Sequence, residues 1–241
     1  MSRTPTDPAD ESPSTPPPVV RFEGVRLGGG AGGSVIKATF AINPGGLYLL
    51  TGPAGSGKTE AFDLIGLNSR RAQGRIDLFG RDVSRLKARE VPLMRRRIGR
   101  VFQDLRLDDD MSAFDNVALA VRATGANAED SRHKIAELLG WLGLTAQMGK
   151  RPKRLSPLDQ RRLAIARAVI NRPTLIIADE PTGELEGKAA AAVLEALIDM
   201  HHVGATVLVA SRRANLLDDA GATVMSLVPH AAHDPHEGAQ T

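Results

Sequence analysis

The sequence predicts an α/β fold in which a helical subdomain is inserted into a domain with a parallel sheet covered by helices. Strand-like and helix-like stretches alternate over residues 174–227, which is typical of a parallel sheet with helices on its faces. Helical patterns dominate about residues 86–158. A glycine-rich loop at residues 52–59 stands between an apolar strand and a helix, a context typical of phosphate-binding folds.

Length and composition are those of a globular chain. Its 241 residues, 42% of them hydrophobic, are enough for one large domain or a domain with a subdomain. Aromatic residues make up 3% and the net charge is +3, which argues against a nucleic-acid module. The absence of cysteine excludes disulfides and thiolate metal sites. No apolar run is long enough to span a bilayer, so we expect any membrane contact to come through a partner.

The folded body is expected at about residues 19–229, between two tails without periodicity. Residues 1–18 are rich in Pro, Ser, Thr and Asp, and residues 230–241 contain His, Ala, Pro and Gly, so both tails are predicted to be disordered.

Short apolar runs bounded by turn residues predict the strands. A glycine-rich stretch at 28–33 joins the first two, and a turn at 80–82 closes the fourth. In chain order the predicted strands are residues 19–25, 35–42, 47–51, 76–79, 174–178, 206–210 and 223–227.

Longer stretches with apolar residues at helical spacing predict the helices. In chain order they are residues 59–67, 112–124, 130–142, 159–171 and 189–202. Trp141 lies in one of these apolar stretches and is interpreted as a packing residue.

Residues 52–59 match the pattern of a phosphate-binding loop, which requires Gly, four residues, Gly, Lys, and then Ser or Thr. Glycines are needed because the backbone turns tightly and points its N–H groups at phosphate oxygens. The alternative is a chance match in a glycine-rich chain, and the strand before the loop and the helix after it argue against chance. We predict that Lys58 reaches the terminal phosphates and that the Thr59 hydroxyl binds Mg²⁺. The predicted ATP-binding residues of this loop are Gly52, Pro53, Ala54, Gly55, Ser56, Gly57, Lys58 and Thr59.

A second motif is the apolar run that ends in Asp179 and Glu180. A buried strand that delivers an aspartate to the carboxyl edge of a parallel sheet can hold Mg²⁺, and the adjacent glutamate can act as the base for an attacking water. The alternative is a strand that runs into a solvated acidic turn. We predict Asp179 as a Mg²⁺ ligand and Glu180 as the catalytic base.

These motifs and others in the same order resemble the ATP-binding subunits of ABC transporters. Val101-Phe102-Gln103-Asp104 resembles the family's Q-loop, and Leu155-Ser156 begins the segment where its signature belongs. The resemblance covers about residues 19–228 and implies an ABC-type P-loop NTPase fold, a RecA-like core with an antiparallel portion and a helical subdomain. It also implies that Gln103 binds Mg²⁺ and the attacking water, and that Ser156 meets the ATP bound by a second copy.

Within the family the sequence is most similar to the FtsE-type subunits of cell division, on residues 21–23, 84–92, 95–99, 102–104 and 115–118. That resemblance implies a homodimer formed on ATP binding, peripheral on the cytoplasmic face of the inner membrane. It implies an FtsX-like integral membrane subunit as partner, which regulates peptidoglycan hydrolases. A lipoprotein-release or macrolide-export subunit is an alternative, as is a heterodimer with a partner whose signature is intact.

The sequence departs from the family where ATP hydrolysis is organised. Pro157 and Leu158 replace the two signature glycines, and Pro157 has no N–H to donate. Arg212 replaces the switch histidine; it can bind phosphate but cannot act as a base. Glu186 replaces the D-loop aspartate, and Leu27 with glycines replaces the aromatic that stacks on adenine. Two interpretations remain: drift in a working ATPase, or an ATP-binding scaffold that hardly hydrolyses.

Two weaker signals remain open. Arg95–Arg97 and Arg100 flank Gln103, and the patch is interpreted as a docking site for a membrane subunit, a solvated basic face, or a nucleic-acid contact. Histidines recur every third residue in the C-terminal tail, at His230, His233 and His236. They are interpreted either as a metal site or as part of an unstructured tail.

Overall fold

A computed structural model describes residues 16–29, 35–127 and 129–228. The expected tail segments 1–15 and 229–241, with the three tail histidines, lie outside the described residues, as do residues 30–34 of the glycine-rich stretch. None of the described helices combines the length and the apolar composition needed to cross a membrane.

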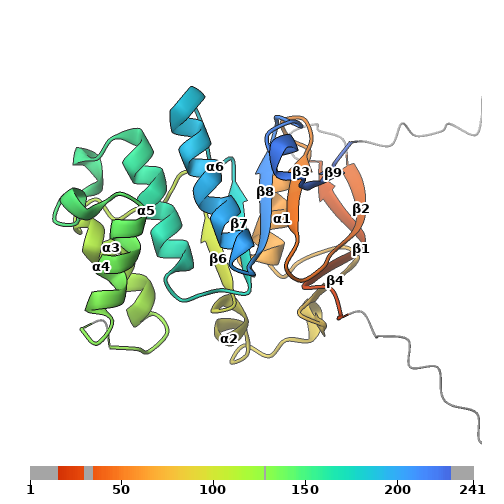
Figure 1. Cartoon of the computed structure of the whole chain (residues 1–241). Coiled ribbons are helices and arrows are strands. Elements are labelled where there is room, and N and C mark those ends of the chain that lie inside the picture. Colours follow the sequence, from red (N-terminus) through yellow and green to blue (C-terminus); the bar gives the residue numbers. More distant parts are fainter. Residues whose placement is uncertain (1–15, 30–34, 128, 229–241) are drawn as a thin grey trace, which may run out of the picture.

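A parallel sheet forms the centre of the molecule (Figure 1). Its strand order is β6-β7-β8-β3-β9, so that neighbours in space are distant in sequence and are joined by crossovers. The strands are β3 (Leu47–Thr51), β6 (Ile98–Val101), β7 (Leu175–Asp179), β8 (Thr206–Ser211) and β9 (Thr223–Ser226). Because all pairs are parallel, the carboxyl ends of these strands meet at one edge of the sheet.

An antiparallel sheet of order β2-β1-β4-β5 lies at one end of the molecule (Figure 1). Its strands are β1 (Val20–Gly28), β2 (Val35–Ile42), β4 (Arg75–Leu78) and β5 (Arg81–Asp82). Buried and exposed residues alternate along β1 and β2, which gives the sheet one face for the core and one for solvent. Phe22 and Phe40 stack with ring centroids 4.6 Å apart, which ties β1 to β2.

The helices cover both faces of the central sheet. α3, α4 and α5 gather at the end opposite the antiparallel sheet, and α1 packs between the two sheets (Figure 1). The helices are α1 (Lys58–Ile65), α2 (Val91–Arg95), α3 (Ala113–Arg122), α4 (Arg132–Trp141), α5 (Pro157–Val169) and α6 (Gly187–His202). Single 3₁₀ turns are η2 (Val83–Arg85), η3 (Thr145–Gln147), η4 (Pro152–Arg154) and η5 (Asp218–Ala220).

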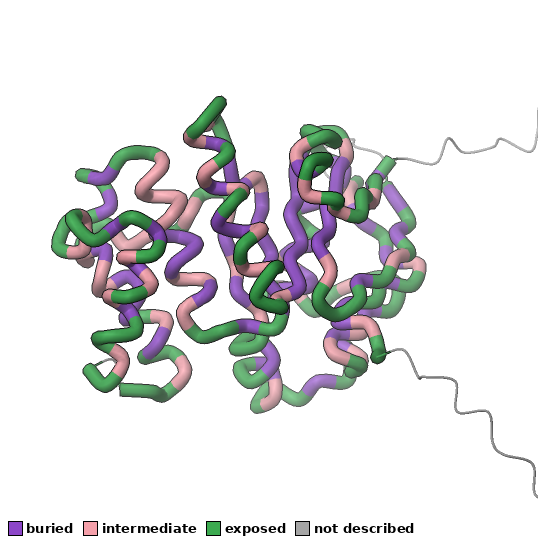
Figure 2. Tube along the Cα trace, in the orientation of Figure 1, coloured by how far each residue is buried: buried purple, intermediate pink, exposed green. Residues whose placement is uncertain are grey.

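Two hydrophobic cores share the central sheet, one on each face. Leu50 and Ile177 face the core that α1 and the antiparallel sheet complete. Their neighbours Leu49 and Ile176 face the core that α3 to α6 complete. Figure 2 shows the central strands as buried segments between helices that are exposed on their outer sides. Burial on both faces explains why these strands are nearly continuous apolar runs in the sequence.

The predicted fold class is confirmed, and the structure adds elements that we did not predict. Strand β6 and helix α2 lie within the range 86–158, which we expected to be helical. β6 is only four residues long and contains Gly99 and Arg100, so its sequence has no apolar run. Trp141, expected to be a packing residue, is 50% exposed.

Candidate functional site

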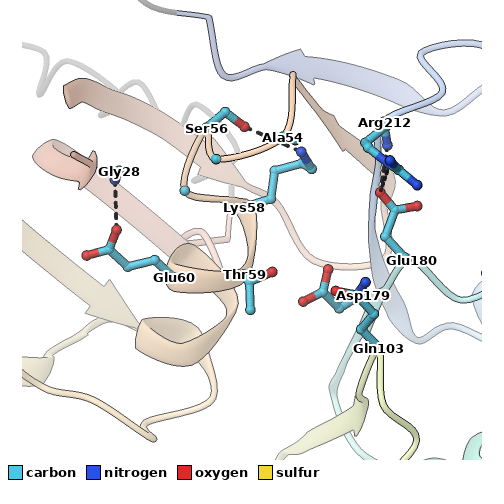
Figure 3. A pocket seen from close by; sticks show the side chains of 12 residues that line it. Gly28, Ala54, Ser56, Lys58, Thr59, Glu60, Gln103, Asp179, Glu180 and Arg212 are labelled. Carbon is cyan, nitrogen blue, oxygen red and sulfur yellow. Dashed lines mark hydrogen bonds and ion pairs between the residues drawn. The ribbon is translucent and has the colours of Figure 1, made fainter. Parts of the chain in front are cut away.

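A cavity of about 600 Å³ lies at the carboxyl edge of the central sheet. It collects residues from the loop after β3, the loop after β6, and the ends of β7 and β8 (Figure 3). Its lining residues are Gly28, Ala54, Gly55, Ser56, Gly57, Lys58, Thr59, Glu60, Gln103, Asp179, Glu180 and Arg212. The structure therefore brings most of the predicted site residues together; Gly52 and Pro53 approach through their carbonyl groups, which contact Lys58.

The Lys58 side chain folds back onto the phosphate-binding loop, residues 52–59. Its ammonium group donates to the carbonyl oxygens of Gly52 at 2.7 Å and Pro53 at 2.9 Å, and to Ser56 Oγ at 3.4 Å. Burial lowers the pKa of Lys58, and the carboxylates of Glu180 and Asp179 act in the opposite direction. The loop oxygens are weak substitutes for anionic oxygens, so a phosphate group that enters the cavity can replace them.

Gly57 brings the loop against the end of β1. Its φ is +87°, and a Cβ built there would lie 2.7 Å from Leu27 Cβ and 2.8 Å from the Gly28 nitrogen. A side chain at this position would therefore meet backbone as well as a core residue. This contact fixes the start of α1, whose first backbone N–H groups border the cavity.

Asp179, Thr59 and Gln103 supply oxygen atoms to the same part of the cavity (Figure 3). Asp179 ends β7 and is only 2% exposed. Burial raises the pKa of its carboxyl group, and the Thr59 hydroxyl and Arg100 act in the opposite direction. A carboxylate, a hydroxyl and an amide oxygen fit the preference of Mg²⁺ for oxygen ligands, and the charge of the ion would offset the cost of the buried carboxylate.

Both carboxylate oxygens of Glu180 contact the end of β8. Its Oε1 accepts a hydrogen bond from the Arg212 backbone N–H at 2.9 Å, and its Oε2 accepts one from the Ser211 hydroxyl at 3.2 Å. The Arg212 Nε also lies 3.7 Å from Oε1 (Figure 3). The Arg212 side chain is 72% exposed and that of Glu180 only 16%, so Arg212 covers the carboxylate from the solvent side.

Sequence reasoning missed Gly28 and Glu60. The Glu60 carboxylate accepts a hydrogen bond from the Gly28 backbone N–H at 2.8 Å, at the end of the cavity away from Glu180 (Figure 3). Glu60 follows Thr59 directly in the first turn of α1, and this adjacency to the loop was a signal that could have identified it.

Ser156 is not among the described residues that line this cavity. It is the N-cap of α5, where its hydroxyl oxygen accepts a hydrogen bond from the Asp159 backbone N–H at 3.1 Å. Pro157 is the first residue of that helix, a position that suits proline because the missing N–H has no helical partner. A second copy of the chain would be needed to bring Ser156 to bound ATP.

Comparison with known proteins gives consistent matches. Residues 35–183 match the family model described as ABC transporter. The chain is 38% identical over 200 residues to the cell division ATP-binding protein FtsE of Escherichia coli strain K12, covering 83% of this chain and 90% of that protein. It is 36% identical over 205 residues to the lipoprotein-releasing system ATP-binding protein LolD of Novosphingobium aromaticivorans, covering 83% and 92%.

A solved structure agrees with the fold. The dimeric structure of MJ0796, a bacterial ABC transporter cassette, matches with a TM-score of 0.70 and 28% identity, over 82% of this chain and 89% of that chain. The same cassette is also known as a dimer in a post-hydrolysis state bound to ADP and Pi, with a TM-score of 0.70 and 29% identity.

Proposed function

The chain belongs to the ABC transporter family and is an ABC-type ATPase, and from that premise we propose that it is the ATP-binding subunit of an FtsEX-like cell-division complex. In this proposal it works on the cytoplasmic face of the inner membrane, and ATP binding and hydrolysis act on an FtsX-like membrane subunit that regulates peptidoglycan hydrolases. The observation that carries the proposal is the cavity that joins Lys58, Asp179 and Glu180, in a chain 38% identical to FtsE.

The geometry suggests how the residues act on ATP. The phosphates would bind the backbone N–H groups of the loop, and the Lys58 ammonium would exchange its loop carbonyls for the terminal phosphates. Thr59, Gln103 and Asp179 would hold Mg²⁺, which when bound neutralises charge that develops on the phosphates. Glu180 would accept the proton of the attacking water.

The engagement of Glu180 supports slow hydrolysis. A base must reach the attacking water, but in this structure each oxygen of Glu180 accepts a hydrogen bond from the end of β8, which holds the carboxylate toward that strand. The exposed Arg212 side chain covers this carboxylate and restricts the approach of water from the solvent side. We therefore propose that the resting subunit binds ATP readily and hydrolyses it slowly until Arg212 moves toward the bound phosphates.

Turnover of the purified protein tests this proposal. We expect measurable ATP binding and a turnover at least about tenfold below the ~10 s⁻¹ typical of enzymes. Replacing Arg212 with His, together with Pro157→Gly and Leu158→Gly, should raise the turnover, and Glu180→Gln should abolish it. Rapid turnover of the unmodified protein that Glu180→Gln abolishes would contradict slow hydrolysis and leave the ATPase assignment intact.

A basic groove supports docking of the membrane subunit. It measures about 460 Å³ and is lined by Arg95, Arg96, Arg100 and Phe102 from the segment around β6 and by residues of α3 and α5. The Arg100 side chain is only 9% exposed, and its Nη2 pairs with Asp63 at 2.8 Å. Its Nε and Nη1 are buried and have no hydrogen-bond partner among the described residues. The exposed arginines of this groove, Arg95 and Arg96, suit an acidic segment of the partner.

Co-purification tests the docking groove. The tagged chain would be expressed with the FtsX-like membrane protein and recovered from detergent-solubilised membranes. Arg96→Glu should reduce recovery of the membrane protein at least about tenfold, because it places a negative charge in the groove. The control is Arg132→Glu, an exposed position on α4, which should leave recovery unchanged. Equal recovery with Arg96→Glu would argue against this groove.

A lipoprotein-release subunit is the second candidate, favoured by the 36% identity to LolD. The partner distinguishes the two functions. Co-purification of a four-helix FtsX-like protein supports cell division, whereas co-purification of a lipoprotein-release permease would overturn that assignment and retain the ATPase.

A further inference from the structure

Arg161 connects helix α5 to the turn that carries Glu180. Its guanidinium Nη1 donates to the backbone carbonyl oxygen of Pro181 at 2.9 Å and to that of Glu180 at 3.3 Å. These carbonyls belong to the turn that follows β7, so one side chain holds the backbone carbonyl of the predicted base and that of the next residue. Charged donors to carbonyl oxygens are stronger than neutral ones, and the pair of contacts fixes direction as well as distance.

Gly183 makes room for this guanidinium. A Cβ built at Gly183 would lie 2.0 Å from Arg161 Nη2 and 2.6 Å from its Cζ, so any other residue would displace the group. The φ of Gly183 is +53°, and its N–H donates to the Glu180 carbonyl oxygen at 2.9 Å, the oxygen that also accepts from Arg161. The turn is therefore shaped around the Arg161 side chain.

A second arginine contacts the same turn. Arg213, just beyond β8, donates to the Thr182 hydroxyl oxygen at 2.8 Å. Burial lowers the pKa of Arg161, and the nearby Glu184 acts in the opposite direction. Removing a guanidinium partly from water costs free energy unless hydrogen bonds compensate for it. The hydrogen bonds of Arg161 to the turn provide this compensation, so the contact differs from an exposed surface pair.

Arg161 lies on the same helix as Ser156, five residues along. Ser156 caps α5, does not line the cavity of its own chain and is exposed, so a second copy can reach it. In the proposed dimer, the N-terminus of α5 would face the ATP of the other copy. Within its own subunit, the same helix contacts the backbone of Glu180 through Arg161. A shift of the helix on contact with the other copy's ATP would move the backbone of Glu180 through Arg161.

We propose that Arg161 is a positioning residue that transmits the placement of the α5 N-terminus to Glu180, so that hydrolysis at one ATP site depends on occupancy of the other. The inference rests on the proposed function as a dimeric ATPase. It adds a named side chain and a direction of coupling: from Ser156 of one site, through α5 and Arg161, to Glu180 of the second.

The first test replaces Arg161 with Gln in the full chain. Single-turnover hydrolysis of radiolabelled ATP, with protein in excess, measures rates even for a slow enzyme. We expect the rate constant to fall about tenfold, the affinity for ATP to change less than about twofold, and the Hill coefficient of steady-state turnover to fall toward 1. Arg161→Lys should restore part of the rate because it keeps a charged donor. Arg132→Gln is the matched control, an exposed arginine on α4 that should behave as the unmodified protein.

The second test is a double-mutant cycle between Arg161 and Gly183. Gly183→Ala should lower the hydrolysis rate about tenfold, because the added methyl group displaces the guanidinium. In the Arg161→Ala background the space is open, so the same change should cost much less. The backbone strain at Gly183 is present in both backgrounds and cancels in the comparison.

The outcomes separate the inference from the proposed function. Additive effects of Arg161→Ala and Gly183→Ala, or an Arg161→Gln variant with unchanged rate and Hill coefficient, overturn the role of Arg161. A fall in ATP affinity and thermal midpoint that matches the fall in rate assigns Arg161 to folding only and also overturns it. Absence of any hydrolysis by the unmodified protein instead overturns the ATPase itself.

Discussion

Single residues determine what can enter the cavity and what can happen there. Gly57 leaves no room for a side chain, Glu60 places a negative charge at the end away from Glu180, and Arg212 covers the predicted base. Each of these residues acts locally, at its own part of the cavity. Single substitutions, each with a matched control in the same chain, therefore test them separately.

Gly57→Ala should abolish ATP binding and lower the free energy of unfolding by about 2–4 kcal/mol. The new methyl group would meet backbone atoms, and the alanine would have to adopt a positive φ. Gly55→Ala is the control. Gly55 has a φ of +78° but nothing lies within 4 Å of its Cβ position, so it should cost only about 1 kcal/mol. Urea denaturation and calorimetric ATP titration measure both effects. Equal destabilisation by the two variants would show that the contact with β1 does not matter.

Glu60→Gln should tighten ATP binding about two- to fivefold, because it removes a negative charge that lines the same cavity as the phosphates. The amide oxygen of Gln can still accept the hydrogen bond of the Gly28 N–H. The difference should shrink as salt is added, since salt screens the repulsion. Titration calorimetry at two salt concentrations tests this, with the exposed Glu137→Gln of α4 as control. Unchanged or weaker binding by Glu60→Gln would instead assign this carboxylate to nucleotide contact.

At the scale of elements, the short segment from β5 through η2 depends on a charged cap. Asp82 is the N-cap of η2 and accepts hydrogen bonds from the Ser84 backbone N–H at 2.8 Å and from its hydroxyl at 2.6 Å. The hydrogen bond from the Ser84 side chain, followed by that from its backbone, lowers the pKa of Asp82 below its usual value. The ionised form is therefore favoured in the folded protein.

Asp82→Ala should lower the thermal midpoint at pH 7 by about 2–4 °C, the effect of losing a cap worth about 1 kcal/mol in a chain of this size. Because the folded pKa is lowered, the stabilisation is present above the unfolded pKa of about 4 and is lost as the pH falls through the folded value. The difference from the unmodified protein should thus shrink below about pH 4 in thermal scans. Asp219→Ala, an exposed position on η5, is the control. A constant difference across this pH range would exclude the charged cap.

The sequence predicted elements best where a local pattern decides the structure. Strands β2 and β3 begin and end where their apolar runs do, and α3 begins after Ser112, whose side chain caps it. β6 was not predicted, since it forms a strand only because β7 lies beside it. The same distinction holds in the site. Lys58 and Asp179 belong to local motifs, whereas the contact between Arg212 and Glu180 joins two strand ends that only the sheet order brings together.

At the scale of the whole molecule, the central sheet separates two cores and gathers the site at one edge. The phosphate loop lies between β3 and α1, whereas α5, which Ser156 caps, lies with the helices at the end opposite the antiparallel sheet (Figure 1). In the proposed dimer, α5 of a second copy would complete the ATP site of the first. Neither the spacing of the motifs nor any local sequence pattern predicts how α5 lies relative to the phosphate loop. That arrangement follows from how the two cores are joined.

Glu180→Gln with ATP and Mg²⁺ should convert the protein from a monomer of 25.6 kDa to a dimer of about twice that mass, because ATP that is not hydrolysed stays between the two copies. Size-exclusion chromatography with light scattering measures the mass. Lys58→Ala added to Glu180→Gln is the control and should remain a monomer, since it removes the ammonium that binds phosphate. A dimer without nucleotide, or none with ATP, would contradict assembly through bound ATP.

The backbone at Glu180 matters for anyone who redesigns this protein. Its φ of +43° is a conformation that glycine and asparagine adopt more cheaply than glutamate, by about 1–2 kcal/mol for glycine. Directed evolution or computational design that selects only for heat resistance would favour replacing this residue. Screens for a more robust variant should therefore hold position 180 fixed or score ATP consumption alongside melting temperature.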